Sequence, residues 1–268
     1  WRAGRGRRTM AAIVNANSAA PLRLAEMTWE EVRDLDKSRA MAILPSGAIE
    51  AHGPHLPLDT DIVIAEAMAE SAARILSQRG QLPVFLPPFA FTAAPFAGAF
   101  AGTISISPDA SAAMLMDLAR SLDRAGFRTM AIANAHLDPT HLGSLHAAVD
   151  QARRELKLAI AFPDLTRKPW ALRLTDEFKS GACHAGRFET SIVMARHPDR
   201  VRETLRLHLP ENASSLSVAI REQKKTFLEA GGPLAYFGAP AEASVEEGRQ
   251  TIQILGEILA ECVLEMPA

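Results

Sequence analysis

Short apolar runs alternate with helix-like segments along most of this chain, and this alternation limits the possible folds more than any other feature. The order of strand, helix, strand and helix predicts a mainly parallel sheet with helices on both faces, an α/β fold. From apolar periodicity and from proline, glycine and capping residues, we predict strands at residues 41–44, 84–86, 129–133 and 158–162, and helices at 62–78, 108–125, 141–156, 188–195 and 245–264.

The chain has no internal repeat and no long low-complexity linker, so we expect a single domain over residues 21–268. Residues 1–20 are expected to form a disordered extension, because residues 1–8 carry four arginines among small residues without an amphipathic pattern. The uncharged stretch 80–108 is broken by prolines and glycines. It is therefore expected to be a strand and a loop, and not a membrane span.

The net charge and the cysteine content bear on which partners and which compartment to expect. The net charge of −2 gives no reason to expect nucleic acid or an anionic membrane. The two cysteines, Cys183 and Cys262, are too few for a disulfide framework and suit a reducing cytoplasm, where we expect the protein.

The loop after the first predicted strand carries the strongest functional signal. Five side chains within residues 50–61 can bind a metal, and these are Glu50, His52, His55, Asp59 and Asp61. Carboxylates and imidazoles hold zinc, iron or manganese at catalytic positions. Asp61 alone could equally be a helix N-cap. Taken together, the group favours a metal site, with His55 orienting the loop or a ligand through a hydrogen bond and Asp59 exposed to solvent.

A second cluster, Asn134 to Asp138, follows another predicted strand and places His136 and Asp138 two residues apart. A lone histidine here would more often be a half-buried structural residue. Both clusters, however, follow strands of one parallel sheet, whose carboxyl ends form the usual ligand site. We therefore predict that His136 and Asp138 join the first cluster as ligands, and that His141 reaches the mouth of the site.

These clusters resemble the motifs of the creatininase family, the creatinine amidohydrolases. Four ordered blocks between about residues 30 and 201 carry the resemblance, and they are Glu50-x-His52-Gly53-x-His55-Leu56-Pro57-x-x-x-Asp61, Gly102-Thr103, Asn134-Ala135-His136 and His184-Ala185-Gly186-Arg187-Phe188-Glu189-Thr190-Ser191.

The resemblance implies a creatininase-like fold and a two-metal hydrolase that cleaves a C–N bond of a small cyclic amide or formamide through a metal-bridging hydroxide. It implies two divalent ions per chain, zinc with manganese, iron or a second zinc, and a homo-oligomer, commonly a hexamer. By position, Glu50 and His136 would bind one metal, His52 and Asp138 the other, and Asp61 would bridge them. His184 would act as the general acid at the leaving nitrogen.

The chain departs from the family pattern around the substrate, which argues against creatinine itself. Asp138 stands where creatininase has Glu, Leu137 where it has an aromatic residue that contacts substrate, and Cys183 where an acidic residue precedes the family histidine. Two alternatives follow from this divergence. One is a small-peptide hydrolase of the cofactor-maturation type, and the other is a non-catalytic binding or scaffold protein.

Two further residues keep more than one interpretation. Cys183 beside His184 could suggest a thiol nucleophile, but adjacent side chains on extended chain point apart, which disfavours a Cys-His pair. Glu189 could bind metal, contact substrate or partner the metal loop, and we count it with His184 as catalytic. A glutamate in the first turn of a helix is also locally favourable without any such role.

Overall fold

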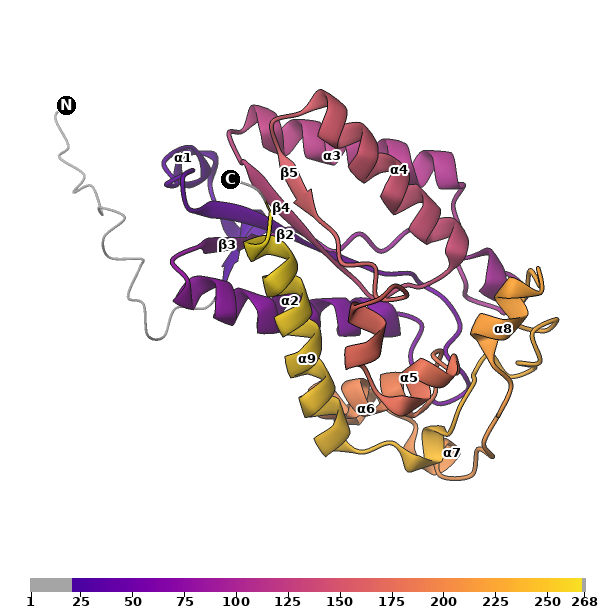
Figure 1. The fold of residues 1–268 in the computed structure, drawn as a ribbon. Helices are drawn as coiled ribbons and strands as arrows, with labels where there is room; N and C mark the ends of the chain where they lie inside the picture. Colours follow the sequence, from indigo (N-terminus) through magenta and orange to yellow (C-terminus); the bar gives the residue numbers. More distant parts are fainter. Residues whose placement is uncertain (1–20, 267–268) are drawn as a thin grey trace, which may run out of the picture.

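Five parallel strands form the centre of the molecule, in the order β1-β3-β2-β4-β5 (Figure 1). The computed structural model describes residues 21–266, so the expected disorder of residues 1–20 lies outside the described part of the chain. The strands are Leu22–Arg23 (β1), Ala40–Ser46 (β2), Leu82–Phe85 (β3), Thr129–Asn134 (β4) and Ala159–Ala161 (β5). The predicted parallel α/β sheet is confirmed.

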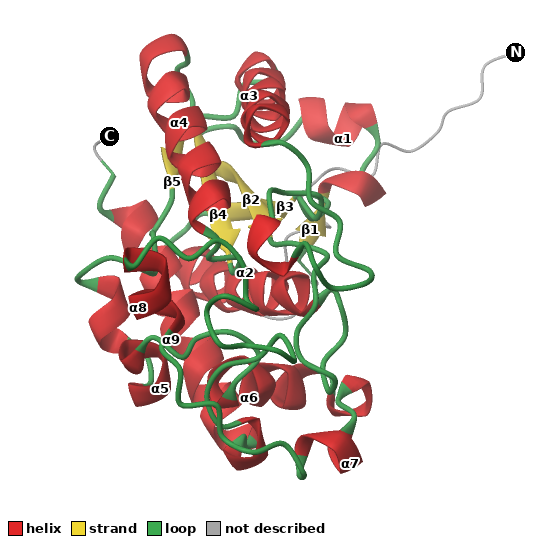
Figure 2. Cartoon of the chain, turned by 90° about the vertical axis from the view of Figure 1, so that its right-hand side faces the viewer, coloured by secondary structure: helices red, strands yellow, loops and turns green. Residues whose placement is uncertain are grey.

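Helices cover both faces of this sheet, as Figures 1 and 2 show. On one face α3 packs with α4, and on the other α2 packs with α9, each pair over its own apolar core. The helices of the described chain are Trp29–Arg33 (α1), Thr60–Gln78 (α2), Pro108–Arg124 (α3), Pro139–Glu155 (α4), Asp176–Ser180 (α5), Arg187–Arg196 (α6), Glu203–Arg206 (α7), Leu216–Arg221 (α8) and Val245–Leu264 (α9).

Local signals set the ends of the long helices. The Ser107 side chain accepts the N–H of Ala110 at the start of α3, where Pro108 occupies the first helical position. The Ser244 side chain likewise accepts the N–H of Glu247 at the start of α9. In α2 the N-cap position belongs to Asp59, without a side-chain cap, so Asp61 is not the N-cap and lies inside the first turn.

The strand order brings the two functional loops together. β2 lies between β3 and β4, and Ser46 pairs with Asn134 where β2 and β4 end. The loop after β2 and the loop after β4 therefore leave the sheet side by side, at a point where the chain crosses from one side of β2 to the other. No helix within residues 21–266 is long and apolar enough to cross a membrane.

Candidate metal centre

Five acidic and imidazole side chains converge at the carboxyl ends of β2 and β4, and all of them are buried. Glu50 and His52 come from the loop after β2, Asp61 from the first turn of α2, His136 from the loop after β4, and Glu189 from the first turn of α6. Ligand atoms from these residues lie within 4.8 Å of one another in two sets of three, Glu50 with Asp61 and His136, and His52 with Asp61 and Glu189.

Asp61 belongs to both sets because its two oxygens face different imidazoles. Oδ1 lies 3.1 Å from Nε2 of His52, and Oδ2 lies 3.1 Å from Nδ1 of His136. Oδ2 also accepts the N–H of Ala48 at 3.1 Å, which fixes the plane of the carboxylate. Gly47 permits this placement, because a Cβ there would lie 2.6 Å from Cβ of Asp61. Asp61 therefore stands between two potential ion positions.

A backbone carbonyl holds the outer nitrogen of each histidine in the cluster. Nδ1 of His52 donates to the carbonyl of Glu50 at 3.1 Å, and Nε2 of His136 donates to that of Ala93 at 2.9 Å. A carbonyl only accepts, so each outer nitrogen carries a hydrogen. The inner nitrogen faces the carboxylates, to which it donates when the ring is protonated, and it offers its lone pair when a cation takes the place of that proton. Fixing the tautomer and ring in this way is what a metal-binding histidine requires.

The donor set fits divalent cations. Nitrogen and oxygen ligands that share one ion, each about 2.0–2.2 Å from it, lie about 3 to 4 Å apart. The inner nitrogen of His136 lies 3.3 Å from Oε1 of Glu50, and that of His52 lies 3.6 Å from Oε2 of Glu189. Oε2 of Glu50 is buried and has no hydrogen-bond partner in the described chain. Such an atom needs a proton or a cation to offset its burial.

The charges of the cluster shift one another's pKa. Burial disfavours a charged His52, but the carboxylates, above all that of Asp61, raise its pKa to about 10. Burial also opposes charge on His136, and Glu50 and Asp61 raise its pKa well above the usual value. The pKa of Glu189 rises to about 8, mainly through burial. The carboxylates therefore require nearby positive charge, which either imidazolium groups or divalent cations can supply.

The structure places Asp138 apart from these ligand atoms. It is the N-cap of α4, where Oδ1 accepts the N–H of Thr140 at 2.7 Å and Oδ2 accepts the N–H of Phe96 at 3.2 Å. Glu189 stands beside His52 instead, at the place expected of Asp138. The sequence did contain a signal for the cap, since Asp138 precedes Pro139 and a helical pattern.

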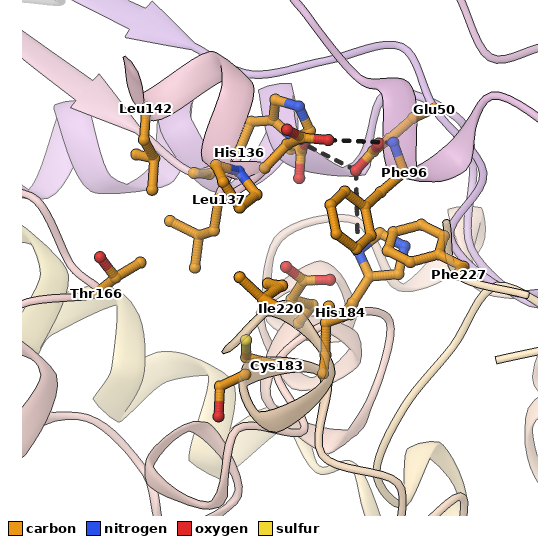
Figure 3. Close-up of a pocket in the computed structure, with 17 residues that line it drawn as sticks. Glu50, Phe96, His136, Leu137, Leu142, Thr166, Cys183, His184, Ile220 and Phe227 are labelled. Atoms are coloured by element: carbon orange, nitrogen blue, oxygen red, sulfur yellow. Dashed lines mark hydrogen bonds and ion pairs between the residues drawn. The ribbon is translucent and has the colours of Figure 1, made fainter. Parts of the chain in front are cut away.

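His184 lies at the edge of the cluster, on the loop before α6. Its Nε2 donates to the carbonyl of Ala51 at 2.9 Å, and its Nδ1 lies 3.8 Å from Oε1 of Glu50 (Figure 3). Its ring lies 4.3 Å from the rings of both His52 and Phe227. Burial, together with the charge of His52, lowers the pKa of His184 well below its usual value. His184 is therefore a neutral imidazole with its Nδ1 lone pair toward the cluster.

A second layer of polar contacts supports the cluster. Nε2 of His55 lies 2.9 Å from Oγ1 of Thr190 on α6, as expected for a residue that orients the loop. His141 is fully buried and does not reach the mouth of the site. Its Nε2 donates to Asn134, whose amide donates to the carbonyl of His136. Asp59 is partly exposed to solvent, and its carboxylate forms an ion pair with Arg200 at 2.5 Å.

A pocket of about 270 Å³ opens onto this cluster. Its floor is polar, with Glu50, Asp61, His136, His184 and Glu189. Six apolar side chains form most of its sides, and we call them the apolar wall. The members of the apolar wall are Phe96, Leu137, Leu142, Leu216, Ile220 and Phe227.

Cys183 also lines the pocket, but its thiol is not poised for nucleophilic attack. Burial and the charges of Glu189 and Glu177 raise the pKa of Cys183 to about 12. The thiolate is the nucleophilic form of cysteine, and it is disfavoured at this position. This agrees with the prediction against a Cys-His nucleophile.

Glu177 on α5 is a structural partner of the site that our sequence analysis missed. Its carboxylate accepts the N–H groups of Arg187 at 2.9 Å, Phe188 at 2.6 Å and Ala239 at 2.8 Å. The first two belong to the first turn of α6, whose N-cap is a glycine without a side chain. Burial raises the pKa of Glu177, while the three N–H groups favour its charged form. No motif surrounds this residue, so only the structure reveals it.

Replacing Glu177 by glutamine is expected to destabilise the protein and to displace Glu189. An amide has one accepting oxygen, so its NH₂ group would face a buried backbone N–H. Loss of such a charge-assisted bond costs about 1–3 kcal/mol in the free energy of unfolding, to be measured by urea denaturation. The matched control is Glu242→Gln, which removes an exposed ion pair with Arg187 and should cost less than about 1 kcal/mol. Equal stability of the two variants would contradict this role.

Comparison with known families gives a match over nearly the whole described chain. The family profile of creatininase, described as creatinine amidohydrolase, matches residues 25–263. A mycofactocin precursor peptide peptidase of Mycobacterium ulcerans is 30% identical over 246 residues, which are 90% of each chain.

Solved creatininase structures share the fold. A structure described as creatininase with manganese superposes with a TM-score of 0.71 at 20% identity, covering 92% of this chain and 98% of the other. A mutant creatininase described as of zinc–zinc type gives a TM-score of 0.67 at 19% identity, with coverage of 92% and 98%. At this identity the similarity establishes the fold, and the metals are those of the creatininases.

Proposed function

This chain belongs to the creatininase family of amidohydrolases, and from that premise we propose that it binds two divalent cations in the buried cluster and hydrolyses a C–N bond of a small substrate. The two oxygens of Asp61, each 3.1 Å from a different imidazole nitrogen, carry this proposal. A carboxylate in that position can bridge two ions, with separate ligands on each side.

In the proposed site Glu50, Asp61 and His136 would hold one ion, and His52, Asp61 and Glu189 would hold the other. The two sets of ligand atoms support this assignment, which replaces Asp138 by Glu189. Bound divalent ions would polarise the amide carbonyl and activate water near neutral pH. Imidazole and carboxylate donors suit zinc, manganese and iron, so zinc with a second zinc, manganese or iron is the proposed content.

His184 would move the proton in this reaction. Its Nε2 is held by the carbonyl of Ala51, so the exchangeable position is Nδ1, on the side of Glu50. A neutral imidazole first accepts a proton at Nδ1 as water attacks, and then donates it to the leaving nitrogen. The low pKa of His184 favours this order, because the ring begins without a proton at Nδ1.

Two substrate classes are compatible with the site. The creatinine amidohydrolase family supports a cyclic amide, with a formamide as the related small substrate expected from the sequence motifs, and the mycobacterial relative supports a short peptide. The alternative of a non-catalytic binding protein is less favoured, since five ligand residues remain together in buried positions. The homo-oligomer expected from the resemblance stays a prediction.

The decisive experiment is metal content per chain, by inductively coupled plasma mass spectrometry, for the wild type and two variants. We expect about two ions for the wild type, about one for Glu189→Gln, and about two for Asp138→Asn. Loss of an ion in Asp138→Asn with retention in Glu189→Gln would restore the ligand role of Asp138.

Hydrolysis is then tested on the metal-loaded wild type with creatinine, a hydantoin, a formamide and a set of short peptides. Cleavage that disappears on treatment with a chelator and returns with zinc or manganese supports the proposed function. A wild type that takes up no metal when zinc or manganese is added would overturn it and favour the scaffold alternative.

A further inference from the structure

The apolar wall flanks the acidic and imidazole side chains of the pocket and comes from distant parts of the chain (Figure 3). Leu137 precedes α4 and Leu142 lies in its first turn, while Leu216, Ile220 and Phe227 belong to residues 212–238. The residues that line the pocket include no lysine or arginine. The carboxylate of Asp138 also lines it, but both its oxygens already accept backbone N–H groups.

The segment of residues 212–238 is a closed loop. At its base Asn212 and Gly238 exchange both backbone hydrogen bonds, at 2.9 and 2.7 Å. The Asn212 side chain donates further to the carbonyls of Gly231 and Tyr236, at 3.0 and 2.9 Å. These contacts tie together the two ends of the segment, which carries α8.

The same segment is fixed against the metal centre at its inner edge. The N–H of Phe227 donates to the carbonyl of Phe96 at 3.0 Å, and the Phe227 ring lies 4.3 Å from the ring of His184. The hydroxyl of Ser215 donates to the carbonyl of Ser180 at 2.9 Å. Leu216 and Ile220, one turn apart on α8, thereby face the pocket beside the group proposed to move the proton.

We propose that the apolar wall is the specificity site of this enzyme, and that it takes an uncharged aliphatic or aromatic group next to the scissile amide. This inference rests on the proposed function, because the polar floor defines where the amide lies. A group the size of a leucine side chain, buried on the wall, should gain roughly 10- to 100-fold in affinity. A carboxylate or phosphate there would lose its hydration without a cationic partner.

The pocket's size agrees with such a ligand. At about 270 Å³ it lies near the lower end of the range for small-molecule sites, so it suits an amide with one attached side group. Ile220 and Leu137 are only partly buried and stand where that group would cover them. An apolar group of the substrate would thus bury the exposed parts of Ile220 and Leu137.

Binding of three hydroxamates to the zinc-loaded protein, measured by isothermal titration calorimetry, tests the wall. The hydroxamate end is common to all three, and the attached groups are a methyl in acetohydroxamate, an isobutyl-bearing chain in 4-methylpentanohydroxamate, and a carboxylate in succinic monohydroxamate. We expect the isobutyl-bearing probe to bind roughly 10- to 100-fold more tightly than acetohydroxamate. Tighter binding of the carboxylate probe, or equal binding of all three, would overturn the proposal.

Ile220→Lys should reverse the order by offering the carboxylate probe a cation, whereas Val218→Lys on the exposed side of the same helix should leave it unchanged. If Ile220→Lys still binds the isobutyl-bearing probe more tightly than the carboxylate probe, the proposed specificity site is contradicted. If the protein takes up no metal, the wall is tested alone by saturation-transfer NMR with 4-methylpentanamide and succinamate. The proposal is supported if 4-methylpentanamide binds selectively and Ile220→Lys removes that binding. Equal saturation-transfer signals for 4-methylpentanamide and succinamate would overturn it.

Discussion

Replacing Asp61 by alanine is expected to reduce the metal content from about two ions per chain to near zero and to abolish hydrolysis. Each ion position would lose a negatively charged donor at once, since Oδ1 faces His52 and Oδ2 faces His136. Loss of a residue that hydrogen-bonds to a metal ligand already lowers metal affinity about 10- to 100-fold. Loss of a ligand shared by both ions should lower it further. Plasma mass spectrometry and turnover measure both effects.

Two further variants separate charge from shape. Asp61→Asn keeps the size of the side chain and should also release the ions. Asp59→Ala changes the residue at the N-cap of the same helix and breaks its pair with Arg200, without touching the cluster. It should keep about two ions, and circular dichroism should report a folded chain for all three. Retention of both ions in Asp61→Ala would refute the bridging role.

Replacing His184 by alanine should leave about two ions bound and lower kcat by about 10²- to 10⁴-fold, which is the usual contribution of a general acid or base. The reason is that its Nδ1 is the proposed site of proton transfer, while Asp61 and the other ligands stay in place. The change should be larger in kcat than in KM. It is measured by steady-state kinetics on whichever amide the substrate panel identifies.

His146→Ala is the matched control for His184→Ala. His146 is hydrogen-bonded to the carboxylate of Asp164 at 2.8 Å and lies outside the pocket. This variant should keep the kcat of the wild type. An unchanged kcat in His184→Ala would exclude proton transfer by this residue. Loss of an ion in His184→Ala would make His184 a ligand, since ligand atoms of Glu50, His52 and His184 also lie within 4.8 Å of one another.

Sequence periodicity predicted the long elements well because their signals are local and repeated. The bounds of α9 agree with the prediction, since a serine cap precedes five turns of apolar pattern. β1 has two residues, and α5, α7 and α8 have four to six, too few for a period to emerge. These elements owe their conformation to tertiary contacts, such as the pairing of β1 with β3.

The meeting of the two ligand loops was also predictable, because adjacent parallel strands end at one edge of the sheet. Which of Asp138 and Glu189 lies beside His52 was not predictable, since it depends on side-chain length. Both oxygens of the short Asp138 carboxylate accept backbone N–H groups, one of them in the first turn of α4. The longer Glu189 side chain extends from α6 to His52. Glu177 was missed because its partners are main-chain N–H groups, which leave no pattern in the sequence.

The histidine anchors have a consequence for how this enzyme can diverge. His52, His136 and His184 are oriented by the carbonyls of Glu50, Ala93 and Ala51, which are main-chain atoms. Every amino acid offers that carbonyl, so these hydrogen bonds do not depend on side-chain chemistry at positions 51 and 93, where two buried alanines also leave the histidine rings room. The orientation of the three imidazoles is thereby set by the path of the main chain. Substitutions in the apolar wall can therefore reshape the pocket while these three hydrogen bonds remain.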